Sequence, residues 1–281
     1  MKRSGKQIII ELNTKDVYKI REAVNSNNNL AIVKKNEYSD GKNKFNYFSW
    51  DRICACMDRI DDTLQYLNEL NLQVLENKRS AFEFYNFLNH AFVLIDCIKT
   101  IALIFEIDKS IIKKVENSRE CFGEYSTSGN DNDFFVYIRS LCSVHPVNTT
   151  RHRKFFNGAN IHCCPYVIWN DRYNITDENK NYELIVRIYN SMNDGRNNEI
   201  LLKIESFEKY INKWLGLADC IVDAILKYYD KTYEEKRNIQ IKGEKCFNDY
   251  INYIKYLRSE DGNRFNRGEE YYYNYYISVL S

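Results

Sequence analysis

Arg139 and His145 are the residues in this sequence whose types and spacing are best suited to chemistry. An arginine keeps its charge at physiological pH and presents a planar fork that matches phosphoryl oxygens. A histidine titrates near neutral pH, so it can both accept and donate a proton. The two side chains together suit a reaction at a phosphate in which negative charge builds up and a proton moves.

A helix predicted over residues 131–145 must position this pair. Its apolar residues share one face, and they are Phe134, Phe135, Ile138, Leu141 and Cys142. Arg139 and Ser140 fall on another side of the same helix. Pro146 disfavours helical geometry at His145, so we expect the helix to end there and the imidazole to turn back toward Arg139.

The segment RSLCSVHP, which begins at Arg139, resembles the R-x(4–6)-H motif of the HEPN superfamily, in which a proline often follows the histidine. The resemblance covers the helical portion, residues 50–236. It implies a helical bundle with the motif late in a core helix. For active members it implies a metal-independent endoribonuclease whose homodimer combines two motifs in one site, in toxin–antitoxin, abortive-infection or antiviral systems. Family members often have Asn, Asp or His where this chain has Ser140.

The chemistry that this resemblance implies needs no cofactor and no metal. An RNA 2′-hydroxyl attacks the adjacent phosphate and gives a 2′,3′-cyclic phosphate and a free 5′-hydroxyl. His145 would act as the acid and base, Arg139 would bind the phosphoryl oxygens, and Ser140 would offer a hydrogen bond. The alternative for the same residues is a buried structural Arg–His pair that closes a helix end.

Two other groups of residues allow both a binding and a structural interpretation. A basic cluster after the motif either positions RNA phosphates or forms a solvated loop, and it consists of Arg151, His152, Arg153 and Lys154. The tyrosines within residues 271–276 either stack on single-stranded bases, form a dimer surface, or pack half of their rings in a core. His90 is interpreted as a surface or inter-helix histidine.

The cysteines give little support for a metal site. The segment His162-Cys163-Cys164 contains adjacent cysteines, which rarely bind one tetrahedral ion, and Cys54 and Cys56 lack a second pair at matching spacing. The chain has nine scattered cysteines, no apolar stretch in its first residues long enough for a signal peptide, and no run of about 18 apolar residues. These features predict a cytoplasmic protein with free thiols and no membrane span.

The composition permits a buried core and argues against a strongly basic nucleic-acid coat. Of the 281 residues, 44% are hydrophobic, and 40 basic residues balance 39 acidic ones to leave a net charge of +1. RNA would therefore have to bind through a local patch. The other partners that we expect are a second copy of the chain and an antitoxin or activator protein.

Apolar residues recur at steps of three and four along stretches that begin at Ile53, Ala81 and Phe207, which predicts long helices packed in a bundle. The predicted helices span residues 50–77, 79–106, 131–145, 205–236 and 243–259. The segments QIIIEL and LAIV near the N-terminus, and CCPYVIW, YELIVRIY and NEILLKI farther along, predict short strands.

The sequence therefore predicts a mainly α protein. A HEPN-like helical bundle over residues 49–260 would carry a small antiparallel β insertion at about 162–205. Residues 1–48 would form an N-terminal α/β extension, and residues 261–281 a Tyr-rich tail. We expect an endoribonuclease of HEPN type. The alternative is a non-catalytic HEPN-like module that binds a protein or nucleic acid through its β insertion or its tail.

Overall fold

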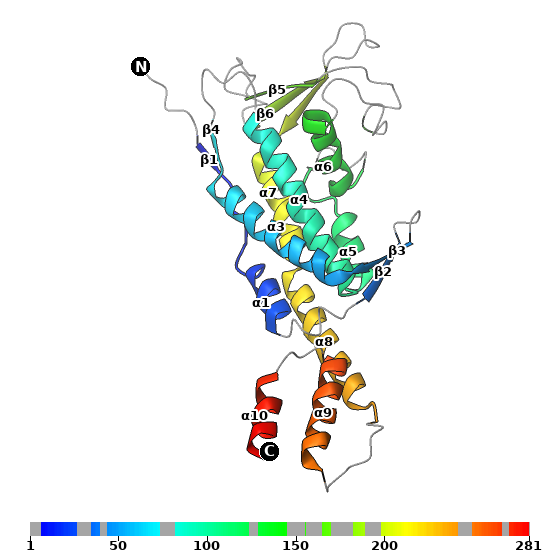
Figure 1. Ribbon diagram of the computed structural model, residues 1–281. Coiled ribbons are helices and arrows are strands. Elements are labelled where there is room, and N and C mark those ends of the chain that lie inside the picture. Colours follow the sequence, from blue (N-terminus) through cyan, green and yellow to red (C-terminus); the bar gives the residue numbers. More distant parts are fainter. Residues whose placement is uncertain are drawn as a thin grey trace.

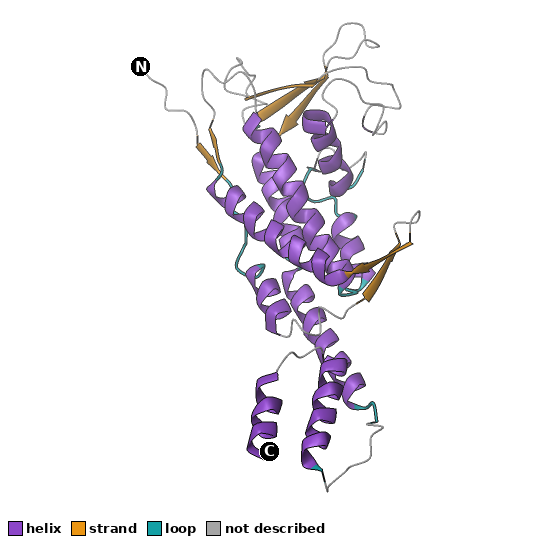
Figure 2. Ribbon diagram, in the orientation of Figure 1, coloured by secondary structure: helices purple, strands orange, loops and turns teal. Residues whose placement is uncertain are grey.

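The protein is mainly helical, as the heptad stripes predict (Figures 1 and 2). The computed structural model describes residues 7–26, 35–39, 44–73, 82–123, 129–144, 155, 165–169, 182–188, 198–240, 249–265 and 270–280. A three-stranded sheet lies at one end of the molecule and the last two helices lie at the other, with the helical bundle between them (Figure 1).

The centre of the bundle is a hairpin of α3 (Ser49–Glu69) and α4 (Phe82–Ile104), which run in opposite directions. Both helices follow the predicted stripes. The prediction for the first helix extended too far, because the chain leaves α3 after Glu69 and forms the short strand β4 (Asn71–Gln73). This strand pairs antiparallel with β1 (Gln7–Ile9), a long-range contact that local periodicity does not encode.

The predicted helix over 205–236 is two helices, α7 (Ile204–Leu215) and α8 (Ala218–Arg237). Gly216 lies between them, and glycine is a poor helix former. The Leu217 amide donates to the Trp214 carbonyl at 3.1 Å, a three-residue bond that tightens the end of α7. The heptad stripe continues through this break, which explains why the pattern alone indicated one helix.

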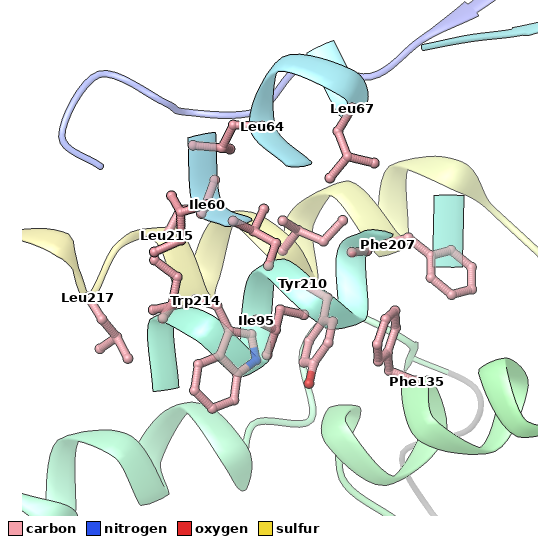
Figure 3. Packing of buried hydrophobic residues seen from close by; sticks show 14 of the residues in the cluster. Ile60, Leu64, Leu67, Ile95, Phe135, Phe207, Tyr210, Trp214, Leu215 and Leu217 are labelled. Atoms are coloured by element: carbon pink, nitrogen blue, oxygen red, sulfur yellow. The ribbon is translucent and has the colours of Figure 1, made fainter. Parts of the chain in front are cut away.

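The core lies where α3, α4, α6 (Asp131–Arg139) and α7 meet (Figure 3). Trp214 and Phe207 of α7 are fully buried, and both lie on the predicted stripe. Phe207 meets Phe84 of α4 edge-on with ring centroids 5.5 Å apart, and Tyr210 lies 5.0 Å from Phe135 of α6. This aromatic cluster fixes α6, and therefore the candidate site, on the bundle.

Helix α4 is long and apolar enough to cross a membrane by length and composition, with a mean hydropathy of 1.7, a feature that the sequence-based prediction did not register. Within the protein, 56% of that apolar stretch is buried. Its stripe residues Leu88, Ala91 and Ile98 are fully buried against neighbouring helices. This burial is typical of the central helix of a packed core.

The predicted β insertion is a three-stranded antiparallel sheet. It consists of β5 (Pro165–Trp169), β6 (Leu184–Ile188) and β7 (Asn198–Leu202), in the order β5-β6-β7. The sequence did not predict the hairpin of β2 (Lys35–Ser39) and β3 (Lys44–Phe48), or the helix α5 (Lys109–Glu116). The predicted strand LAIV lies outside the described residues.

The chain ends in two helices, α9 (Tyr250–Phe265) and α10 (Glu270–Leu280), which lie side by side beyond α8 (Figure 1). The helix predicted at 243–259 is thus placed several residues too early. Part of the Tyr-rich tail is helical, and Tyr275 and Tyr276 are 57% and 54% exposed. These two rings are therefore not buried in a core.

The N-terminal helix α1 (Tyr18–Ser26) packs against α8 from the other end of the chain. The buried Tyr229 hydroxyl donates to the Val24 carbonyl at 2.7 Å. Val24 lies in the last turn of α1, where backbone carbonyls have no amide donor within the helix. Tyr229 therefore satisfies a buried backbone group and joins the two ends of the sequence.

Replacing Tyr229 by phenylalanine is expected to lower the free energy of unfolding by about 1 kcal/mol, because the buried Val24 carbonyl loses its donor. Urea denaturation monitored by circular dichroism measures the change. Tyr18→Phe, at the start of α1 and 46% exposed, is the matched control and should stay within about 0.5 kcal/mol of wild type. Equal stability of the two variants would contradict the assigned role of this hydroxyl.

Candidate functional site

Helix α6 (Asp131–Arg139) carries Arg139 at its last residue. Its N-terminus is capped by Asn130, whose Oδ1 accepts from the Asp133 amide at 2.7 Å. The predicted apolar face is confirmed, since its residues are at most 4% exposed: Phe134, Phe135, Ile138, Leu141 and Cys142. The helix is therefore held firmly along one side, which leaves Arg139 at its outer edge.

The prediction was a continuous helix over residues 131–145, but the α-helix ends at Arg139. Residues Ser140–Val144 form η2, a π-helical turn, with wider winding than an α-helix. Such turns occur often at functional sites because the local change in winding redirects side chains. Here the change falls within the interval between the two motif residues, Arg139 and His145.

A buried carboxylate anchors the start of α6. Asp131 is 1% exposed and accepts hydrogen bonds from the Ser118 hydroxyl at 2.7 Å and from the amides of Glu120, Cys121 and Phe122 at 3.1–3.3 Å. Burial by itself raises the pKa of Asp131, but these hydrogen bonds outweigh it and hold the pKa below its ordinary value. The loop before α6 is thus tied to the helix that carries Arg139.

The Arg139 guanidinium is positioned by two residues of α4. Its Nε donates to Asn89 Oδ1 at 3.3 Å, and its Cζ lies 3.8 Å from the centroid of the Phe92 ring. The Ser143 hydroxyl lies within hydrogen-bonding distance of the same Asn89 oxygen, at 3.3 Å, and of the Arg139 carbonyl, at 2.9 Å. Asn89 therefore links α4 to both α6 and the π-helical turn.

The charge of Arg139 is not neutralised by direct pairing within the part of the chain that the structure describes. No described carboxylate forms an ion pair with it, and no described residue accepts a hydrogen bond from Nη1 or Nη2. Burial lowers the pKa of Arg139, while the Asp96 carboxylate acts in the opposite direction. Arginine remains charged under these conditions, so its terminal nitrogens can bind an anion.

Ser140 does not lie where the sequence predicts. It was expected to share a side with Arg139 away from the apolar face, but it is 6% exposed and packs in the core. Its hydroxyl has no hydrogen-bond partner among the described residues. The serine that reaches the Arg139 cluster is Ser143, because the π-helical turn alters the angular positions that an α-helix would give.

Several residues of the predicted site lie outside the described residues. They are His145 and the predicted RNA-binding cluster Arg151, His152, Arg153 and Lys154. Phe155, which follows this cluster in the sequence, is described. Its ring stacks on Tyr137 of α6 with centroids 4.5 Å apart and planes 6° apart.

The other candidates from the sequence are distributed over the bundle. His90 is half-buried between helices, with its ring 4.1 Å from that of Tyr66 on α3, and both burial and Arg59 lower its pKa. Within the described ranges, no group of three or more His, Cys, Asp or Glu side chains could hold a metal. Cys54 and Cys56 are free thiols on α3, and the segment 162–164 lies outside the described ranges.

Sequence reasoning missed Asn89, Phe92 and Asp131. The first two lie on α4, and nothing in the local pattern of that helix relates them to a motif about fifty residues away. The pair Asn130-Asp131 at the start of a predicted helix was an available signal, because such residues favour helix N-termini.

Comparisons with protein-family models, with curated proteins and with solved structures found no match to this chain. The resemblance to the HEPN superfamily therefore depends on the spacing of Arg139 and His145, on Pro146, and on the helix that carries Arg139.

Proposed function

We propose that this protein is a metal-independent endoribonuclease of HEPN type that acts as a toxin or antiphage effector. One observation carries the proposal: Arg139 is a partly buried cation that Asn89 and Phe92 hold in place while no described carboxylate pairs with it. A structural arginine at this depth is normally paired, because an unpaired charge is costly to bury. An arginine that binds a phosphate must keep its fork available.

In this proposal the parts of the guanidinium have separate tasks. Asn89 occupies Nε, and the Phe92 ring supports one face of the planar group. The two terminal nitrogens remain for the oxygens of a phosphate, in the bidentate arrangement that arginine favours. Because both supporting residues come from the central helix α4, the charge is fixed before substrate binds, which favours transition-state stabilisation.

In the proposed reaction, the 2′-hydroxyl of RNA attacks the neighbouring phosphorus and the 5′-oxygen leaves. His145 accepts the 2′-hydroxyl proton, or supplies a proton to the leaving oxygen. Arg139 binds the non-bridging oxygens as their negative charge increases. A second copy of the chain would supply the complementary acid or base, and the basic cluster at residues 151–154 would bind flanking phosphates.

The exposed surface of the C-terminal helices favours the second candidate, a non-catalytic interaction module. Large apolar side chains project from α9 and α10: Tyr250 is 57% exposed, Tyr275 57%, Tyr276 54% and Val279 62%. Aromatic side chains of this kind are enriched at protein interfaces. This surface lies at the opposite end of the molecule from the three-stranded sheet (Figure 1).

The test is incubation of the purified chain with a labelled single-stranded RNA in the presence of EDTA. We expect cleavage, with products that carry a 2′,3′-cyclic phosphate and a 5′-hydroxyl, because the reaction uses the RNA's own hydroxyl and no metal. The double variant Arg139→Ala, His145→Ala is the negative control for contaminating nucleases. Intact RNA with the wild-type chain, or equal cleavage by the double variant, would refute the enzyme and favour the interaction module.

A further inference from the structure

Two free thiols meet across the central helix hairpin. Cys56 of α3 is 9% exposed, and Cys97 of α4 is half-buried. The two thiol groups are hydrogen-bonded to each other. Neither residue takes part in the candidate site around Arg139.

The register of the hairpin brings these residues to nearly the same level along the two helices. The contact between the tilted rings of Tyr66 and His90, 4.1 Å apart, shows which turns of α3 and α4 face one another. Cys56 lies ten residues before Tyr66, and Cys97 lies seven residues after His90. In antiparallel helices these two steps lead in the same direction, and at 1.5 Å per residue they differ by about 4.5 Å, less than one turn.

The surroundings of the two thiols make them chemically unequal. The hydrogen bond from Cys97 lowers the pKa of Cys56, and Arg52 acts in the same direction, against burial and Asp96. The pKa of Cys97 is raised, because this thiol keeps its proton as the donor and is itself buried. A thiolate at Cys56 would therefore have a protonated thiol beside it, which is the pairing that a nucleophilic and a resolving cysteine require.

We propose that Cys56 and Cys97 form a redox-active dithiol that a peroxide converts to a disulfide between α3 and α4. This inference does not depend on the proposed ribonuclease activity. It adds a modification site to the bundle, and its oxidant is a small hydroperoxide such as hydrogen peroxide, whose size suits the limited exposure of Cys56.

The oxidation takes place in two balanced steps. The Cys56 thiolate attacks one peroxide oxygen, the O–O bond breaks, and the departing hydroxide is protonated to water, which leaves a sulfenic acid on Cys56. The Cys97 sulfur then attacks the Cys56 sulfur, the S–S bond forms and the S–O bond breaks. The Cys97 proton leaves with the second water. The two thiols together lose two electrons, and hydrogen peroxide gains them.

Peroxide treatment of the full chain, followed by alkylation and mass spectrometry, tests the proposal. We expect the oxidised chain to lose two alkylatable thiols and to yield a tryptic peptide that links residues 53–59 to the peptide containing Cys97. Dithiothreitol should restore both thiols. The wild-type measurement requires no variant to fold, and equal alkylation of these cysteines before and after peroxide would overturn the proposal.

Cys54 provides a matched control, because it lies in the same tryptic peptide as Cys56 and is also on α3. Cys54→Ser should keep the linked peptide, whereas Cys56→Ser and Cys97→Ser should lose it. The linked chain should also melt at a higher temperature than the reduced chain, since the bond closes a loop of about 40 residues. Persistence of the link in Cys56→Ser would assign it to Cys54 and would overturn the proposed pair.

Discussion

Replacing Arg139 by alanine is expected to reduce RNA cleavage by about 10²–10³-fold, the effect of removing a positioned donor from a developing oxyanion. The guanidinium is already held by Asn89 and Phe92, so it needs little reorganisation when substrate binds. Initial rates with a labelled RNA, measured at saturating and at limiting substrate, give the effect on kcat and on kcat/KM. An equal fold-decrease in kcat and in kcat/KM would show that Arg139 interacts with the transition state and not with the bound substrate.

Two further variants distinguish the shape of Arg139 from its charge. Arg139→Lys keeps the charge but loses the planar fork and the Phe92 contact, so it should recover only part of the activity. Arg237→Ala removes an exposed arginine from the last turn of α8 and should leave the rate unchanged. Thermal melts confirm that each variant is folded. Full activity in a folded Arg139→Ala chain would contradict the assigned role.

Replacing Asp131 by alanine is expected to lower the free energy of unfolding by about 3 kcal/mol or more. The variant leaves the Ser118 hydroxyl and several backbone amides of the preceding loop without their acceptor, and each buried unsatisfied donor costs about 1–3 kcal/mol. Urea denaturation measures the loss. Asp108→Asn, which alters an exposed carboxylate bonded to one amide at the start of α5, is the control and should cost much less.

The same carboxylate predicts a direction for the pH dependence. The pKa of Asp131 is lower in the folded chain than its ordinary value of 3.8. As the pH falls, this carboxylate is therefore protonated at a higher pH in the unfolded chain than in the folded chain. The stabilisation by Asp131 is therefore complete above the unfolded pKa and is lost as the pH falls through the folded pKa. Asp131→Asn should remove this acid-dependent component. A variant with an unchanged acid profile would show that other groups account for it.

The sequence predicted the elements that local periodicity encodes. The stripes beginning at Ile53 and Ala81 correspond to α3 and α4, and the β-prone segments correspond to β5, β6 and β7. It did not predict pairings between distant segments, such as β1 with β4, because an alternating pattern shows which face is apolar and not which partner covers it.

The same distinction applies to the candidate site: its local features could be predicted, and its contacts between distant segments could not. The apolar face of α6 and the position of Arg139 at its edge follow from helical spacing. Asn89 and Phe92 could not be found, since their relation to Arg139 depends on how α4 packs on α6. Ser140 was misplaced because the prediction assumed uniform α-helical winding, whereas the chain changes to a π-helical turn at that residue.

The contacts of the N-terminal residues with α7 and α8 have a consequence for how the molecule is made. Residues 13 and 24 near the N-terminus bond to Asn212 and Tyr229, so their partners leave the ribosome only after most of the chain has been translated. Phe207, against which Phe135 of α6 packs, also comes late. A nascent chain therefore cannot seat the helix that carries Arg139 until synthesis is well advanced. For a protein that cleaves RNA as proposed, this order of assembly would keep the growing chain harmless to the message that encodes it.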